Sequence, residues 1–247
     1  MNEKMLTFPY LKPRVLATDL DNTIVSDKVP HTDLWETLAL ENTSLIYITG
    51  RYRQSAIDLI EREQLPKPDI LICDVGASIY LGPSYELDQE WASNIKQEDF
   101  EQVNTIAKSI DIARQPIDTP WRLAYFASEL QVQILKKAIK QHNLAVDLIF
   151  SSERDVDILP ANINKGAALK YVLNKCNYDG EVVVAGDSEN DLSLFNLGYP
   201  AIAVGNACDA ILALSQNDHI HYAKGHASAG VKEIWEKLYT PLSQKIQ

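Results

Sequence analysis

Two carboxylates one residue apart follow a short apolar run near the start of the sequence. Residues 14–18 carry β-branched and aliphatic side chains that predict a buried strand, and Asp19 and Asp21 come directly after it. Like charges at a shared site disfavour ionisation, and Mg²⁺ binds oxygen ligands of this kind and removes the repulsion. We therefore interpret the pair as a nucleophile and metal site. An ordinary acidic turn after a strand is the alternative.

A threonine and a glycine stand at the end of the next predicted strand. Residues 44–49 form a largely apolar run that leads into Thr49, Gly50 and Arg51, and a helical pattern follows. Backbone N–H groups at a helix N-terminus, together with the Thr49 hydroxyl, make an anion-binding site. A threonine that simply caps the helix is the alternative interpretation.

Lys165 occupies a place that a cation normally avoids. Asn164 is a predicted N-cap, so Lys165 falls in the first helical turn, where its charge opposes the helix dipole by about 0.3–1 kcal/mol. A bound phosphate would explain this placement. A free surface lysine is the default interpretation of any single lysine.

A second acidic pair follows another apolar run. Asp187 comes after the strand predicted at 182–185, and Asp191 lies about one helical turn further along the chain. Both carboxylates can face a common ion, although the helix dipole alone also favours acidic residues at a helix N-terminus. The all-apolar strand places Asp187 at the same sheet edge as Asp19.

Strands and helices alternate on both sides of a different middle third. This alternation is typical of a parallel sheet with right-handed crossovers, in which ligands bind outside the carboxyl ends of the strands. The middle third instead predicts a helix at 97–110, a strand at 121–127, a helix capped by Ser128 and a hairpin of strands at 146–150 and 156–159. We predict an α/β fold: a Rossmann-like parallel-sheet core at 1–80 and 161–247, with an inserted α+β unit at 81–160.

Composition narrows the classes of partner. The net charge of −11 argues against a nucleic-acid or anionic-membrane surface, and any phosphate site must carry its own local positive charge, which Lys165 would supply. No apolar run approaches the length of a membrane span, and the first residues contain no signal-peptide apolar segment. The three scattered cysteines are interpreted as reduced core thiols, which predicts a cytoplasmic location.

The order of these groups resembles the haloacid dehalogenase superfamily. The four motifs of that superfamily match D-x-D-x-T at Asp19, the threonine Thr49, the lysine Lys165 and G-D-x-x-x-D at Asp187. Within it, the segments around Thr49, Lys165 and Asp187 are similar to the sucrose-phosphatase branch, as is the segment 151–160. The resemblance covers nearly the whole chain and implies a core with an α/β cap of the C2 type.

The resemblance also implies a role for each residue. Asp19 would attack phosphorus to form an aspartyl-phosphate, and Asp21 would act first as acid and then as base. Mg²⁺ would be held by Asp19, the Asp21 main-chain carbonyl and Asp187, with help from Asp191. The phosphoryl oxygens would be held by Thr49, Gly50, Lys165 and Asn190.

The inserted unit would close over the rim as a lid that recognises the sugar. Segment 24–48 is too short for a helical lid, whereas segment 77–164 holds the α+β unit. Arg154 and Asp157 on the predicted hairpin are the candidate substrate contacts. Trp121 is a candidate sugar-stacking residue, with a core tryptophan as the alternative.

Two departures from the sucrose-phosphatase pattern bear on the substrate. The family's G-S-E-I-Y turn has Ser78 at the position of the glutamate, and its S-S-G-K-D-V-D segment has Arg154 at the position of the lysine. Arginine and lysine differ in donor geometry, so the sugar that is recognised can differ from that of the family. The substrate is therefore either sucrose-6-phosphate or a related glycosyl or hexose phosphate. The alternatives to a phosphatase are a phosphomutase and a catalytically idle sugar-phosphate binder associated with a glycosyltransferase.

Overall fold

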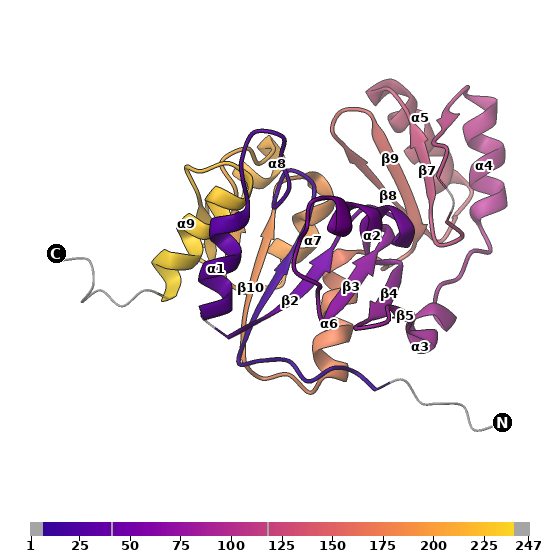
Figure 1. Ribbon diagram of the computed structural model, residues 1–247. Helices are drawn as coiled ribbons and strands as arrows, with labels where there is room; N and C mark the ends of the chain where they lie inside the picture. Colours follow the sequence, from indigo (N-terminus) through magenta and orange to yellow (C-terminus); the bar gives the residue numbers. More distant parts are fainter. Residues whose placement is uncertain (1–6, 41, 118, 240–247) are drawn as a thin grey trace, which may run out of the picture.

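An eight-stranded sheet forms the centre of the molecule. The computed structural model describes residues 7–40, 42–117 and 119–239 (Figure 1). The strands lie in the order β12-β11-β10-β1-β2-β3-β4-β5, of which the six from β12 to β3 are parallel and the last two antiparallel. Their bounds are β1 (Arg14–Thr18), β2 (Thr43–Ile48), β3 (Ile70–Cys73), β4 (Ser78–Leu81), β5 (Glu86–Leu87), β10 (Glu181–Gly186), β11 (Ala201–Ala203) and β12 (Ile220–Tyr222). The predicted parallel-sheet core is confirmed.

Helices cover both faces of this sheet. One apolar cluster joins the sheet to α1 (Thr32–Leu40), α2 (Arg53–Arg62) and α9 (Ala227–Tyr239). The cluster on the opposite face contains residues of α3 (Gln89–Ser93), α6 (Lys165–Lys175), α7 (Leu192–Phe195) and α8 (Asp209–Leu212). Because both faces of the sheet are buried, the central strands are largely apolar. All of β2 is buried, and β1 and β10 are buried except at their first residues, Arg14 and Glu181.

The register of the central strands brings the sequence motifs together. Thr18, the last residue of β1, pairs with Ala185 of β10 on one side and with Tyr47 of β2 on the other. The chain therefore leaves the sheet at Asp19, next to the segments that follow β10 and β2. This adjacency is the common rim that the strand pattern predicts.

A second sheet lies to one side of the core (upper right in Figure 1). Its four antiparallel strands lie in the order β6-β7-β9-β8, with bounds β6 (Ala113–Arg114), β7 (Leu123–Phe126), β8 (Val146–Ser151) and β9 (Asp155–Pro160). The helices α4 (Phe100–Ser109) and α5 (Glu129–Gln141) pack against Leu123, Tyr125, Val156 and Ile158. The residues that alternate with these along β7 and β9 turn to the other face, toward the core. The predicted hairpin and the Ser128 cap of α5 are confirmed.

The sheet pairing bears on where the second unit begins. β5 belongs to the main sheet, and Trp91 and Ile95 lie in the same apolar cluster as β1 and β2. We therefore propose that the second unit, here called the cap, begins after Ile95 rather than at residue 81. A two-residue strand such as β5 leaves no alternation in the sequence from which it could be predicted.

A strained turn connects β3 to β4. Asp74, Val75 and Gly76 have φ values of 53°, 58° and 102°, and a β-branched residue such as Val75 rarely adopts a positive φ. A Cβ at Gly76 would lie 2.3 Å from the carbonyl oxygen of Asn164, so only glycine lets this turn approach the start of α6. The surrounding structure therefore fixes the turn against the loop after β2 and the first turn of α6.

Among the helices that the structure describes, none has both the length and the apolar character required to cross a bilayer.

Candidate active site

A buried ammonium group bridges two carboxylates at the rim. Lys165 Nζ donates one hydrogen bond to Asp19 Oδ1 and one to Asp191 Oδ1, each 2.7 Å long, and the lysine side chain is fully buried. Burial disfavours the charged ammonium, but Asp19 and Asp191 outweigh this effect and raise its pKa. Asn164 caps α6 as predicted, accepting a hydrogen bond from the Ala167 amide. The two carboxylates offset the unfavourable helix dipole at this position.

Asp191 uses both of its carboxylate oxygens inside the protein. While Oδ1 accepts from Lys165, Oδ2 accepts from the backbone amides of Asp187 and Ser188, at 3.0 and 3.1 Å. The helical turn expected between Asp187 and Asp191 is a single 3₁₀ turn, Glu189–Asp191, that leads into α7. Asp191 thus shapes the loop after β10 and orients Lys165.

Asp19 and Asp187 each keep one carboxylate oxygen available. Asp187 Oδ1 accepts from the buried Thr23 hydroxyl at 3.0 Å, and Asp19 Oδ1 accepts from Lys165. No donor within the described part of the chain binds the other oxygen of either group. Burial, followed by the charge of Asp191, raises the pKa of Asp187 to about 7. Burial also raises the pKa of Asp19, against the opposing effect of Lys165.

These carboxylates fit a divalent cation. Oxygen atoms of Asp19, Asp187 and Asp191 lie within 4.8 Å of one another. When all three carboxyl groups are ionised, they and the Lys165 ammonium carry a net charge of −2, which a dication would balance. Hard oxygen donors of this kind suit Mg²⁺. Asp21 contributes no side-chain oxygen to the group.

Arg51 instead holds the side chain of Asp21. Its Nε donates to Asp21 Oδ2 at 2.8 Å and its Nη2 to Oδ1 at 2.7 Å, while Nη1 donates to the Ser55 hydroxyl at 2.8 Å. Bidentate arginine–carboxylate pairs are among the stronger hydrogen-bonded contacts in proteins. The sequence contains Arg51 in the motif after β2, but no spacing rule identifies Asp21 as its partner.

The predicted phosphate-binding residues differ in their access to the cleft. Thr49 is fully buried, and its hydroxyl oxygen accepts from the Arg51 amide at 3.1 Å. Gly50 and Asn190 line the cleft above, whereas Thr49 and Lys165 lie beneath its floor. The side-chain nitrogen of Asn190 is 3.8 Å from the point where a Cβ on Gly50 would stand, so these two residues adjoin.

The cleft lies between the core and the cap. It has a volume of about 420 Å³, and its core-side lining includes Asp19, Asp21, Gly50, Arg51, Asp187 and Asn190. The cap contributes Gln115, Phe126, Ser151, Arg154, Asp155 and Asp157, among others. Around the whole cleft, carboxylates outnumber arginines by five to three. Binding of an anionic substrate is therefore expected to depend on a bound metal as well as on the arginines.

The two predicted substrate contacts, Arg154 and Asp157, have different environments in the structure. The Arg154 side chain is 68% exposed and lies over the Phe126 ring, 4.7 Å from its centroid, so its guanidinium is accessible from the cleft. Asp157 is buried and forms an ion pair with Arg122, a residue that the sequence did not single out. Trp121 does not line this cleft and packs against the core cluster. Ser78 is also fully buried, hydrogen-bonded to Asp74, so the exchange at that position does not alter the cleft wall.

Comparison with known proteins settles the family. The family model for sucrose-6F-phosphate phosphohydrolase matches residues 12–236. The chain belongs to this family. This match confirms the sucrose-phosphatase branch that the sequence motifs resemble. A solved haloacid dehalogenase-like hydrolase from Bacteroides thetaiotaomicron shares the fold, with a TM-score of 0.70.

Two curated proteins and one solved structure show what the chain is similar to. The chain is 31% identical to the glucosylglycerol-phosphate synthase of Pseudomonas anguilliseptica, over 90% of this chain and 30% of that protein. It is 28% identical to the mannosylfructose-phosphate phosphatase of Agrobacterium fabrum, over 85% and 90% respectively. The solved sucrose-phosphatase of Synechocystis sp. PCC6803, in complex with sucrose and phosphate, aligns with a TM-score of 0.84 and 29% identity over 92% of this chain and 98% of that chain. The chain spans less than two thirds of the length of several other curated relatives.

Proposed function

We propose that this member of the phosphohydrolase family is a Mg²⁺-dependent phosphatase that hydrolyses a phosphorylated sugar through an aspartyl-phosphate. The observation that carries the proposal is the state of Asp19. One of its oxygens is fixed by Lys165, the other has no hydrogen bond within the described chain, and the residue lines the cleft beneath the cap. A carboxylate held in this way is oriented for attack on a bound phosphorus atom.

The proposed reaction has two steps on the same carboxylate. The free Asp19 oxygen bonds to phosphorus, the ester P–O bond breaks, and protonated Asp21 gives its proton to the departing sugar oxygen. Asp21, now ionised, then takes a proton from a water molecule as that water attacks phosphorus and releases Asp19 and inorganic phosphate. Arg51 donates to both carboxylate oxygens of Asp21 and so fixes the position of this side chain at the cleft.

The remaining site residues bind and orient in this proposal. Asp19, Asp187 and the main-chain carbonyl of Asp21 hold the metal, with Asp191 acting through Lys165 and the loop backbone. When bound, Mg²⁺ supplies positive charge against the phosphoryl oxygens and the carboxylates. Thr49, Gly50, Lys165 and Asn190 are proposed to bind those oxygens.

The leaving group is proposed to be a glycoside or hexose. Sucrose-6-phosphate and related glycosyl phosphates are the candidates, since the names of the relatives include sucrose, mannosylfructose and glucosylglycerol phosphates. A cap wall of Gln115, Ser151, Asp155 and Arg154 offers hydrogen-bond donors and acceptors to sugar hydroxyls. Arg154 is the proposed sugar contact, whereas Asp157 would act on substrate through its pair with Arg122.

The phosphomutase alternative is less favoured by the arrangement of segment 24–48. Its described residues form short turns, α1 and β2, and Leu34 and Leu38 of α1 pack in the core cluster. The cytoplasmic location stays a proposal that rests on three free cysteines, Cys73, Cys176 and Cys208. An association with a glycosyltransferase stays a prediction that no feature of the described residues tests.

The direct test is release of inorganic phosphate from a panel of disaccharide, hexose and glycosyl-glycerate phosphates, with Mg²⁺ and with a chelator. The proposal predicts release from at least one sugar phosphate, abolished by the chelator and by Asp19→Asn. Asp27→Asn, a change at an exposed position in the same segment, is the matched control and should retain activity. If no sugar phosphate is hydrolysed while the protein binds one with unchanged affinity in Asp19→Asn, the idle binder is the better description.

A further inference from the structure

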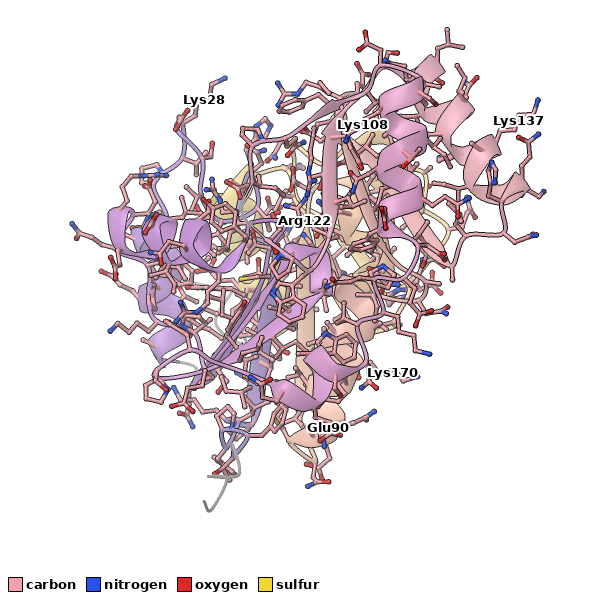
Figure 2. All side chains as sticks on the ribbon, turned by 90° about the vertical axis from the view of Figure 1, so that its right-hand side faces the viewer. Lys28, Glu90, Lys108, Arg122, Lys137 and Lys170 are labelled. Carbon is pink, nitrogen blue, oxygen red and sulfur yellow. The ribbon has the colours of Figure 1, made fainter. Side chains whose placement is uncertain are left out.

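Arg122 is a buried cation at the junction of the cap and the core. It immediately precedes β7 in the cap, and its side chain is only 6% exposed. In Figure 2 it lies near the centre of the molecule, whereas Lys28 and Lys137 project from the periphery. Burying a guanidinium is unfavourable unless other groups balance its charge and accept its hydrogen bonds.

The partners of Arg122 come from both units. Nη1 donates to Asp157 Oδ1 of the cap strand β9. Nη2 donates to the main-chain carbonyl oxygen of Gly50, in the core, at 2.7 Å. Nε lies 3.6 Å from Asp74 Oδ1 in the strained turn after β3, a charge contact rather than a hydrogen bond. One planar fork thus joins a cap carboxylate, the loop after β2 and the turn that supports that loop.

The Gly50 carbonyl belongs to a peptide group at the centre of the proposed phosphate site. The other end of that peptide is the Arg51 N–H, which donates to the Thr49 hydroxyl oxygen at 3.1 Å. The core side of the loop is fixed by Asp74 and Val75, whose amides donate to the carbonyls of Arg51 and Thr49 at 2.9 and 3.1 Å. From the cap side, Arg122 is the residue within the described chain that donates to this loop.

We propose that Arg122 is a positioning residue for phosphoryl transfer: through the Gly50 carbonyl it sets the orientation of the Gly50–Arg51 peptide and of the Gly50 amide toward the phosphoryl group. The inference rests on the proposed function. Because the donor comes from the cap, the phosphate loop reaches its final geometry when the cap is docked on the core. Lysine could not replace the arginine, because a single ammonium cannot present two parallel donors and a third contact in one plane.

The experiment compares Arg122→Lys and Arg122→Met with Arg114→Met. Arg114 is an exposed arginine on β6, the strand next to β7, and serves as the matched control. We expect both Arg122 variants to lose about 10²-fold in kcat, on sugar phosphates and on an aryl phosphate alike, because every phosphate ester uses the same loop. Inorganic phosphate should also become a weaker competitive inhibitor. Arg114→Met should match the wild type in both measurements.

A loss of activity through misfolding is separated from this effect in two ways. Arg122→Lys keeps a positive charge beside Asp74 and Asp157, so it should unfold at a denaturant concentration close to that of the wild type while kcat remains low. In Arg122→Ala, added guanidinium at non-denaturing concentration should restore part of kcat, and should do nothing in Arg114→Ala.

Two results would overturn the inference while the wild type remains an active phosphatase. One is an Arg122→Lys enzyme whose kcat and phosphate inhibition stay within about twofold of the wild type. The other is a loss confined to sugar phosphates, with full activity on the aryl phosphate, which would make Arg122 a sugar contact. If the wild type itself releases no phosphate, the proposed function fails first and independently.

Discussion

Lys165 and Asp19 form a buried ion pair in which the ammonium is shared with Asp191, at 2.7 Å to each carboxylate. Removing one partner of a buried pair leaves a charge without compensation. Lys165 therefore has two tasks: it holds the proposed nucleophile and balances the charge of the acidic site.

The first prediction concerns this pair. Lys165→Met should lower the free energy of unfolding by about 3–5 kcal/mol in metal-free buffer, because Asp19 and Asp191 remain buried without the cation. Denaturant titration in the presence of a chelator measures the loss. Lys170→Met, an exposed change on the same helix, is the control and should alter stability little. A loss of equal size in both variants would contradict the assignment.

The second prediction separates the two roles of Asp21. In Asp21→Asn, kcat on a sugar phosphate should fall by about 10²–10⁴, because the alkoxide leaves without a proton. An aryl phosphate has a leaving group that needs no proton, so its first step should proceed. Rapid mixing should then show a burst of phenolate near one equivalent, followed by slow turnover. Equal slowing of the burst and of turnover would show that Asp21 does not act as acid and base in turn.

The third prediction is a dependence of stability on pH. Burial, followed by Asp191, raises the pKa of Asp187 to about 7 from the model-compound value of 3.8. Between these values the native state holds a proton that the unfolded chain has released, so this carboxyl lowers stability as pH rises through the window. In metal-free protein, the unfolding free energy of Asp187→Asn minus that of the wild type should therefore increase as pH rises from about 4 to 7.

Magnesium supplies the control for this titration. Added Mg²⁺ should stabilise the wild type more at neutral than at acid pH, because it binds the ionised carboxylates. It should stabilise Asp187→Asn much less. Parallel curves for wild type and Asp187→Asn across the whole window would count against a buried, metal-binding Asp187.

The fourth prediction uses two glycines that both have a positive φ. A side chain at Gly76 would meet the Asn164 carbonyl, whereas nothing lies within 4 Å of a Cβ at Gly198. Gly198→Ala should cost only the backbone strain, about 1–2 kcal/mol. Gly76→Ala should cost more and should also lower kcat, because the start of α6 and Lys165 must shift. Thermal unfolding and phosphate release measure the two effects. Equal losses in the two variants would show that the turn at 74–76 does not position Lys165.

The fifth prediction concerns recognition of the sugar. Arg154→Met should change the ranking of sugar phosphates by kcat/KM while leaving turnover of an aryl phosphate nearly unchanged, because the Arg154 guanidinium is exposed at the cap wall and pairs with Asp155 rather than with the buried carboxylates. A uniform fall on every substrate would instead place Arg154 among the residues that act on the phosphoryl group.

The strands of the core and the start of α6 could be predicted from the sequence alone. The apolar runs of β1, β2 and β10, and the Asn164 cap before α6, could be predicted because strand composition and helix capping are local properties. The shared rim followed from them, because parallel strands end at the same edge of a sheet.

Contacts between distant segments could not be predicted in this way. The partner of Arg51 is 30 positions away at Asp21, and Arg122 contacts Gly50 across 72 positions. An arginine accepts many partners, so its position in the sequence does not choose among them. The strained turn at Asp74 and Val75 was missed for a related reason, since tertiary contacts rather than turn propensities stabilise it.

The proposed mechanism depends on covalent phosphorylation of Asp19 during turnover. The most direct measurement is an acid quench of Asp21→Asn during reaction with a labelled phosphate ester, followed by peptide mapping. We expect label on the peptide that contains Asp19, and loss of that label in a variant that also carries Asp19→Asn. Label on another residue, or turnover without any labelled protein in Asp21→Asn, would contradict it.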